Sequence, residues 1–208
     1  EKFRKVMDAA EFTHRSDAES VIRLQENVFK EKLAACEELI LEGLPAAQFE
    51  ALGQALPLYQ KLKRLEIIKF ECGEEEARYF AKALASSAVE MLKVENDFEK
   101  GNKDGLPDSL PLIKALGEAL KSTKSIKDID LRCTCIGLEG AKALAEGLKD
   151  NQSLTKINLG RNRIGPDGAK ALANSLKTNQ SITHINLKYN IIGPEGTEAL
   201  AEALSQSV

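Results

Sequence analysis

Apolar residues recur at the same positions in three segments of the chain. Ser125–Leu131, Ser153–Leu159 and Ser181–Leu187 each have an apolar residue at the second, fifth and seventh position, and the segments begin 28 residues apart. A fixed period of this length is typical of solenoid proteins, in which each unit buries its apolar face only against the neighbouring units. The pattern therefore predicts an elongated array of repeats.

Each unit combines a strand pattern with a helix pattern. The alternating residues Leu154, Ile157 and Leu159 predict a short strand with one buried face. The apolar positions between Ala169 and Leu176 then have the spacing of an amphipathic helix. Strands that alternate with helices are typical of a parallel sheet. Aligning the first apolar position of each strand gives six units, which begin at Cys36, Leu62, Val89, Ile126, Leu154 and Ile182.

The fifth unit resembles the signature of the leucine-rich repeat. The residues at the signature positions are Leu154, Ile157, Leu159, Asn162, Ile164, Gly165, Gly168 and Ala169. The resemblance covers about residues 36–208 and is strongest in the last three units. The repeat length and the Gly-x-x-Gly turn are similar to those of the ribonuclease-inhibitor-like subclass. The resemblance implies an α/β horseshoe solenoid with parallel strands on the concave face and helices on the convex face.

The first residues of the chain have no repeat pattern, and we expect residues 1–35 to form an N-terminal helical cap. Ser16 and Glu19 have the spacing of a capping box, and apolar residues follow at helical spacing. Such a helix would cover the open core of the first repeat. Residues 36–208 are then about six leucine-rich repeats. No polar capping unit precedes Val208, so we expect an exposed apolar edge in the last unit and a continuation of the repeats beyond it.

Composition and charge argue against several classes of function. The formal net charge of −3 gives no reason to expect nucleic acid or an anionic membrane as partner. No apolar run approaches the roughly 20 residues that cross a bilayer. Four cysteines are too few for a disulfide scaffold, so we expect an intracellular, cytoplasmic location. With only two histidines, we expect no catalysis by the chain and no cofactor, while the oligomeric state stays open.

Two asparagines occupy the position where the predicted strand turns outward. We expect the amides of Asn162 and Asn190 to pair with backbone groups of adjacent units that the turn leaves without partners. Thr134 occupies the same position in the fourth unit, and its hydroxyl can form some of these hydrogen bonds. Leu44 and Phe70 cannot, so the first units are expected to turn differently.

The cysteines fall at two kinds of position in the repeat. Cys36 and Cys72 align with buried positions and are expected in the core, whereas Cys133 and Cys135 flank the asparagine position and are expected to be more exposed. A Cys-x-Cys pair can bind a soft metal, but a tetrahedral site needs further ligands, and both histidines lie in distant units. We therefore expect no metal site.

In a parallel-strand horseshoe, the residues that alternate with the buried ones line the concave face. These residues are mainly acidic in the early units and basic in the last two. A charge gradient suits an oriented protein partner, so the main hypothesis is a protein–protein interaction module; the alternative is an ordinary solvated surface. The expected partner-binding residues of this face and its edge are Arg64, Glu66, Lys93, Glu95, Asp128, Asp130, Arg132, Lys156, Asn158, Arg161, His184, Asn186, Lys188 and Tyr189.

The third unit is longer than the others and contains a polar loop. Its Phe-x-x-Gly segment and the following Leu-Pro-x-x-Leu run resemble a loop of the Ran GTPase-activating proteins. In that family an Arg follows the Gly, and the resemblance implicates it in GTPase stimulation. This chain has Asn102 there, and a neutral amide cannot stabilise developing phosphate charge.

The loop supports an alternative hypothesis, in which the partner is a small GTPase. The protein would then be a Ran-type GTPase-activating protein or a descendant that binds without stimulating. Its loop residues would be Lys100, Asn102 and Lys103. A ribonuclease-inhibitor-like enzyme inhibitor is a third hypothesis, and the fold alone does not choose among the three.

Overall fold

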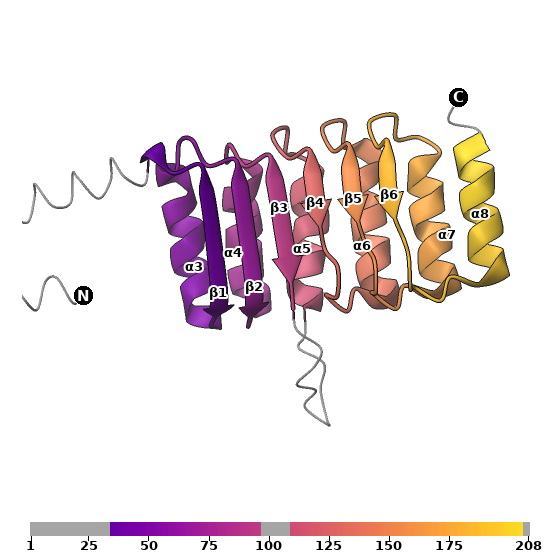
Figure 1. Ribbon diagram of the computed structural model, residues 1–208, viewed down its shortest axis with the longest axis horizontal. Helices are drawn as coiled ribbons and strands as arrows, with labels where there is room; N and C mark the ends of the chain where they lie inside the picture. The colour runs from indigo at the N-terminus through magenta and orange to yellow at the C-terminus, as the bar shows by residue number, and fades with distance from the viewer. Residues whose placement is uncertain (1–33, 97–108, 206–208) are drawn as a thin grey trace, which may run out of the picture.

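The computed structural model describes residues 34–96 and 109–205, which form alternating strands and helices (Figure 1). The strands are β1 (Glu38–Leu44), β2 (Arg64–Phe70), β3 (Met91–Glu95), β4 (Asp128–Asp130), β5 (Lys156–Asn158) and β6 (His184–Asn186). The helices are α3 (Ala46–Ala55), the 3₁₀ helix η1 (Leu56–Leu58), α4 (Glu74–Ala85), α5 (Leu110–Leu120), α6 (Gly137–Asp150), α7 (Gly165–Leu176) and α8 (Gly193–Ser205). The expected cap up to residue 33 and the loop residues Lys100, Asn102 and Lys103 lie outside the described residues.

The strands form one parallel sheet in the order β1-β2-β3-β4-β5-β6. One row of paired residues runs through all six strands and consists of Glu38, Arg64, Met91, Asp128, Lys156 and His184. Each of these residues lies two positions after the apolar residue that the sequence predicts as the start of its unit. The predicted α/β solenoid and the alignment of its six units are therefore confirmed.

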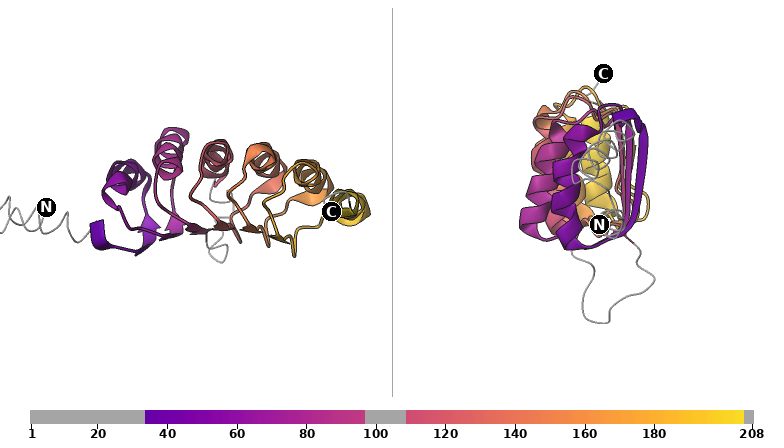
Figure 2. Two further views of the ribbon diagram at one scale, coloured as in Figure 1. Left: turned by 90° about the horizontal axis from the view of Figure 1, so that it is seen from above. Right: turned by 90° about the vertical axis from the view of Figure 1, so that its left-hand side faces the viewer.

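The sheet and the helices form two layers, and the whole array curves gently. Seen from above in Figure 2, the helices lie along the outer side of an arc and the strands along its inner side. The curvature follows from packing distances, because helices need about 10 Å each whereas parallel strands are about 4.8 Å apart. The strands therefore form the concave face, as the sequence predicts.

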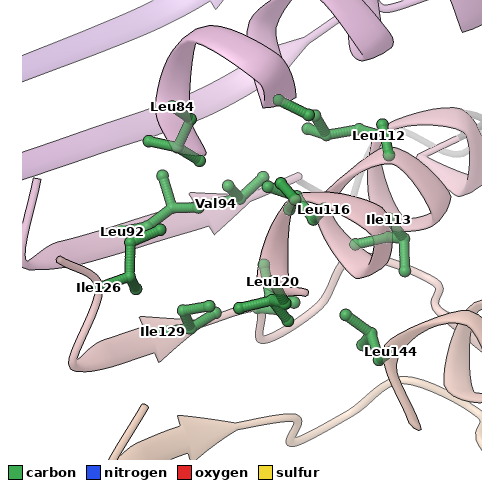
Figure 3. Packing of buried hydrophobic residues seen from close by; sticks show 14 of the residues in the cluster. Leu84, Leu92, Val94, Leu112, Ile113, Leu116, Leu120, Ile126, Ile129 and Leu144 are labelled. Carbon is green, nitrogen blue, oxygen red and sulfur yellow. The ribbon is translucent and has the colours of Figure 1, made fainter. Parts of the chain in front are cut away.

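A continuous apolar core fills the space between the two layers. Strand residues at alternate positions, such as Leu92, Val94 and Ile129, are at most 1% exposed. Figure 3 shows them beside helix residues that include Leu116 and Leu120. Burial of each such side chain contributes on the order of 1.5–3 kcal/mol, so the core rather than any single contact stabilises the array.

The first units turn differently from the later ones, as expected. β1 and β2 have seven residues each, whereas β4, β5 and β6 have three. Leu44 and Phe70 are buried at the position that asparagine takes later. The ring of Phe49 lies 5.6 Å from the ring of Phe70 and 5.5 Å from that of Phe80. Apolar packing thus fills the space where the later units use hydrogen bonds.

In the later units, buried asparagines connect neighbouring turns. Asn162 is fully buried, and its Oδ1 accepts a hydrogen bond from the backbone N–H of Thr134 at 2.9 Å. Its Nδ2 donates to the carbonyl of Leu131 at 2.7 Å. Asn190 makes the same bonds one unit later, to the N–H of Asn162 at 2.9 Å and the carbonyl of Leu159 at 2.7 Å. The predicted role of the two asparagines is confirmed.

A second pair of buried asparagines, Asn151 and Asn179, lies at the turns between helix and strand, and the repeat signature does not indicate it. Asn179 Nδ2 donates to the carbonyls of Leu148 and Asn151, both at 2.7 Å, and its Oδ1 accepts from the N–H of Ile182 at 2.9 Å. Asn151 Nδ2 likewise donates to the carbonyl of Leu120 at 2.7 Å. In the sequence, the signal that could have identified this pair is the 28-residue interval between Asn151 and Asn179. Both ends of each later unit are therefore bonded to the unit before it.

The last unit is less buried than the unit before it. Ile182, Ile185 and Leu187 are half-buried, whereas the equivalent residues of the fifth unit are at most 2% exposed. Ile191 is 83% exposed and Leu204 is 56% exposed. Within the described residues, the expected apolar edge of the last unit is confirmed.

Replacing Asn162 by Leu should lower the free energy of unfolding by about 1–3 kcal/mol, because buried backbone groups lose their partners. Asn174 lies exposed on α7, so Asn174→Leu is the matched control and should change stability by less than about 0.5 kcal/mol. Urea denaturation followed by circular dichroism measures both variants. Equal losses at the two positions would contradict the role assigned to Asn162.

Candidate functional site

The polar strand residues that alternate with the core form the concave face. Its first row is the one that contains Glu38 and His184. The second row consists of Ile40, Glu66, Lys93, Asp130, Asn158 and Asn186. The third row begins with Glu42, Ile68 and Glu95, and Arg132, Gly160 and Lys188 follow two residues after the second-row residues of the later units. The register thus places residues of all six strands on one face, including the strand residues that the sequence singles out.

In the first three units, opposite charges on this face pair with one another. Arg64 Nε lies 2.8 Å from Glu66 Oε1 and 3.0 Å from Glu38 Oε1. Lys93 Nζ lies 3.4 Å from Glu66 Oε2 and 3.1 Å from Glu95 Oε2. This part of the face therefore carries a network in which cations and carboxylates compensate each other.

Glu66 is the centre of this network and is only 5% exposed, although the sequence places it on an open surface. Burial by itself would raise the pKa of its carboxyl group. The hydrogen bond from Arg64 and the charges of Lys93 and Arg64 outweigh burial, so the pKa of Glu66 is lowered. The same hydrogen bond raises the pKa of Arg64. Glu66 is thus held as a carboxylate between two cations.

Asp130, Asn158 and Asn186 are neighbours in the second row and make the same local bond. The Oδ1 of each accepts a hydrogen bond from the backbone N–H two residues later, at 3.1, 3.2 and 3.0 Å respectively. The Asp130 carboxylate also accepts from Arg132 Nε, at 3.0 Å from Oδ2, and this bond raises the pKa of Arg132. The fourth unit is therefore the last one in which a carboxylate and a cation pair on this face.

The last two units present positive charge without carboxylates. Residues 153–166 and 181–194 contain no Asp or Glu. Lys156 and Lys188 are exposed, and neither makes an ion pair with any of the described residues. The neighbouring acidic residues of the concave face are Asp128 and Asp130, which pair with Lys156 and Asn158 in the strand register. We call the concave surface of these two units the basic end.

Two edge residues at the basic end contact each other, as their adjacent positions suggest. The guanidinium carbon of Arg161 lies 5.1 Å from the centre of the Tyr189 ring, a cation–π contact, and Tyr189 is 75% exposed. Both residues have a left-handed backbone, with φ of 59° and 61°. Residues other than glycine rarely adopt this backbone conformation, which costs about 1 kcal/mol per residue. The bonds of Asn162 and Asn190, the residues that follow them, hold the backbone there.

The cysteines differ from expectation. Cys36 and Cys72 are half-buried rather than in the core, and Cys133 and Cys135 are half-buried as well. All four are free thiols. Burial, together with the charge of Glu76, raises the pKa of Cys72 to about 12, so this thiol stays protonated at neutral pH. Among residues 34–96 and 109–205, no cluster of three or more potential ligands could hold a metal ion.

A groove of about 620 Å³ lies on the convex side, between α4 and α5. Its floor includes Ala81, Ala115 and Ala119, whose short side chains leave the space open, and its rim carries charges such as Lys82 and Lys114. The groove is on the helix layer, so it is separate from the concave face.

Sequence comparison identifies repeats in the second half of the chain. A model of the Leucine Rich repeat family matches residues 124–145, 150–173 and 178–201. These are the fourth, fifth and sixth units of the structure. No curated protein sequence matches the chain. The last three units are therefore leucine-rich repeats, and the described chain as a whole has the α/β leucine-rich-repeat type of fold. The ribonuclease-inhibitor-like subclass stays a prediction.

Comparison with solved structures supports the same fold. The C-terminal domain of tropomodulin from Caenorhabditis elegans is similar with a TM-score of 0.55 and 16% sequence identity, over 76% of this chain and 92% of that chain. A structure described as leiomodin-1 actin-binding site 2 is similar with a TM-score of 0.54 and 16% identity, over 86% of this chain and 84% of that chain. None of the helices in the described part of the chain is long and apolar enough to cross a membrane.

Replacing Glu66 by Gln should lower the free energy of unfolding by about 1–3 kcal/mol at neutral pH, because two cations lose their charged partner. A carboxyl group with a lowered pKa stabilises the fold above its unfolded pKa, and this contribution is lost as the pH falls through its folded pKa. The difference between wild type and Glu66→Gln should therefore shrink in acid. Thermal and urea unfolding across the pH range measure it.

The matched control for this experiment is Glu139→Gln, which removes an exposed pair with Lys142 on α6. Its effect should stay below about 0.5 kcal/mol. If Glu66→Gln lost the same free energy at about pH 3 as at about pH 7, the assigned lowering of the Glu66 pKa would be wrong.

Proposed function

We propose that the protein is a protein–protein interaction module that binds its partner on the concave face. The observation that carries this proposal is the sheet itself, which holds charged residues of six units in fixed rows on one continuous surface. A rigid, charge-patterned surface of this kind suits recognition of another folded protein or peptide. The protein-binding residues are those that the sequence predicts on this face and its edge.

The proposal assigns no catalysis to the chain. The carboxylates most enclosed on the face, Glu66 and Asp130, are bonded to arginine and lysine side chains rather than placed beside a nucleophile. The four cysteines are free thiols, which supports an intracellular, reducing environment as part of the proposal.

Actin is a defined partner with which to begin, because one of the structurally similar proteins is described as an actin-binding site. Similarity at 16% identity concerns the fold alone, so actin serves as a test ligand and is not itself proposed as the partner. The GTPase-activating alternative depends on loop residues 100–103, which lie outside the described residues, and no observation on the described part of the chain favours it.

Reversing two charges at the basic end should weaken binding of a protein partner at least tenfold. The variant is Arg161→Glu with Lys188→Glu. We expect tenfold because loss of close charge complementarity costs more than about 1.4 kcal/mol. Affinity capture from cell extract with quantitative mass spectrometry, and direct binding of purified actin, compare the variant with wild type.

Two further variants complete the experiment. Lys142→Glu with Lys170→Glu reverses the same number of charges on the convex helices α6 and α7, and it should change partner binding less than about twofold. Glu38→Lys with Glu42→Lys reverses the acidic end of the concave face. Partner binding that survives both concave variants, or that the convex control weakens equally, would contradict a concave binding site.

A further inference from the structure

The second row of the concave face changes its chemistry at one point without changing its structure. Asp130, Asn158 and Asn186 all use Oδ1 to accept the backbone N–H two residues later. In Asp130 the remaining atom is a carboxylate oxygen. In Asn158 and Asn186 it is the Nδ2 amide, a donor. Because the amide oxygen is held by a backbone donor, the amide cannot flip without losing that bond.

The basic end therefore offers hydrogen-bond donors almost exclusively. Neither Asn158 Nδ2 nor Asn186 Nδ2 has a hydrogen-bond partner among the described residues. The ammonium groups of Lys156 and Lys188 lie in the adjacent rows, and the guanidinium of Arg161 lies at the edge. No carboxylate side chain lies in the two segments that form this surface. Such a surface is complementary to a ligand that is rich in acceptors.

We propose that the basic end is the docking site for an acidic segment of a partner protein. Its Asp or Glu carboxylates would accept bonds from the two asparagine amides and pair with Lys156 and Lys188. This inference rests on the proposed function, since it states which part of the concave face binds and what chemistry it recognises. In the first four units, Arg64, Lys93 and Arg132 of this face are already paired with carboxylates, so the basic end is where an incoming anionic group gains most.

The charge distribution favours a protein segment over a nucleic acid. The uncompensated cations are confined to two neighbouring units, and beyond them the face carries Glu66, Glu95, Asp128 and Asp130. A phosphate backbone that continued along the face would meet these carboxylates within about a Debye length. A short acidic segment covers the basic end alone, and the exposed Ile191 beside it can accept an apolar side chain of the same segment.

The test uses a fluorescently labelled octaglutamate peptide and the full chain, with binding measured by fluorescence anisotropy. Asn158→Asp with Asn186→Asp keeps the local N–H bonds, as Asp130 shows, but replaces two outward donors by carboxylate oxygens. This variant should bind the peptide at least tenfold more weakly with an unchanged melting temperature. Asp130→Asn makes the opposite change and frees Arg132, so it should bind at least twofold more tightly.

The matched control is Asn174→Asp with Gln180→Glu, which adds the same charge at exposed positions away from the concave face and should leave peptide binding within twofold of wild type. Unchanged binding in the Asn158→Asp, Asn186→Asp variant would overturn the proposal. So would the absence of peptide binding, or tighter binding of an oligonucleotide of equal charge. If binding of a protein partner is weakened only by Glu38→Lys with Glu42→Lys, the partner does bind on the concave face, but the proposal of an acidic docking segment is wrong.

Discussion

A unit of this protein cannot satisfy its own backbone at the turns, and the following unit must do it instead. Each later strand is only three residues long, so strand pairing covers few of its polar groups. The turns on either side would bury N–H and carbonyl groups without partners, at a cost of about 1–3 kcal/mol for each. Asn162 and Asn190 at one end, and Asn151 and Asn179 at the other, remove that cost. The apolar core can form only because these bonds let the chain turn inside it.

The concave face is a consequence of the same stacking. Once neighbouring turns are bonded, the strand register is fixed, and residues one period apart become lateral neighbours. Side-chain identity at one position of the repeat therefore becomes a row on the surface. The row that holds Asp130, Asn158 and Asn186 shows this effect. In all three residues Oδ1 accepts a backbone N–H, but the second terminal group is an oxygen in Asp130 and an amide NH₂ in the two asparagines, which alters what the surface can bind.

Much of this fold could be predicted from the sequence, because in a repeat protein the spacing of Leu154, Ile157 and Leu159 reports directly on the register. The roles of Asn162 and Asn190 followed from their place in the period. The burial of Glu66 did not, because it depends on the side chains of Arg64 on the same strand and Lys93 on the next strand, which pair with it. The half-buried cysteines have a related cause, since exposure within a turn is set by the adjacent unit. For the proposed site, the sequence indicated the charges of the basic end but not the orientation of its amides.

The bonds that the buried asparagine side chains make between the later units all run in one direction along the chain. Asn162, Asn179 and Asn190 each bond to backbone groups of the unit before them. Fraying of the sixth unit would therefore remove the partners of buried groups in the fifth, whereas loss of an early unit would leave these bonds intact. The later part of the solenoid is therefore expected to open from α8 towards the middle. The stability of its last unit then controls how readily amide protons throughout the later repeats exchange with solvent.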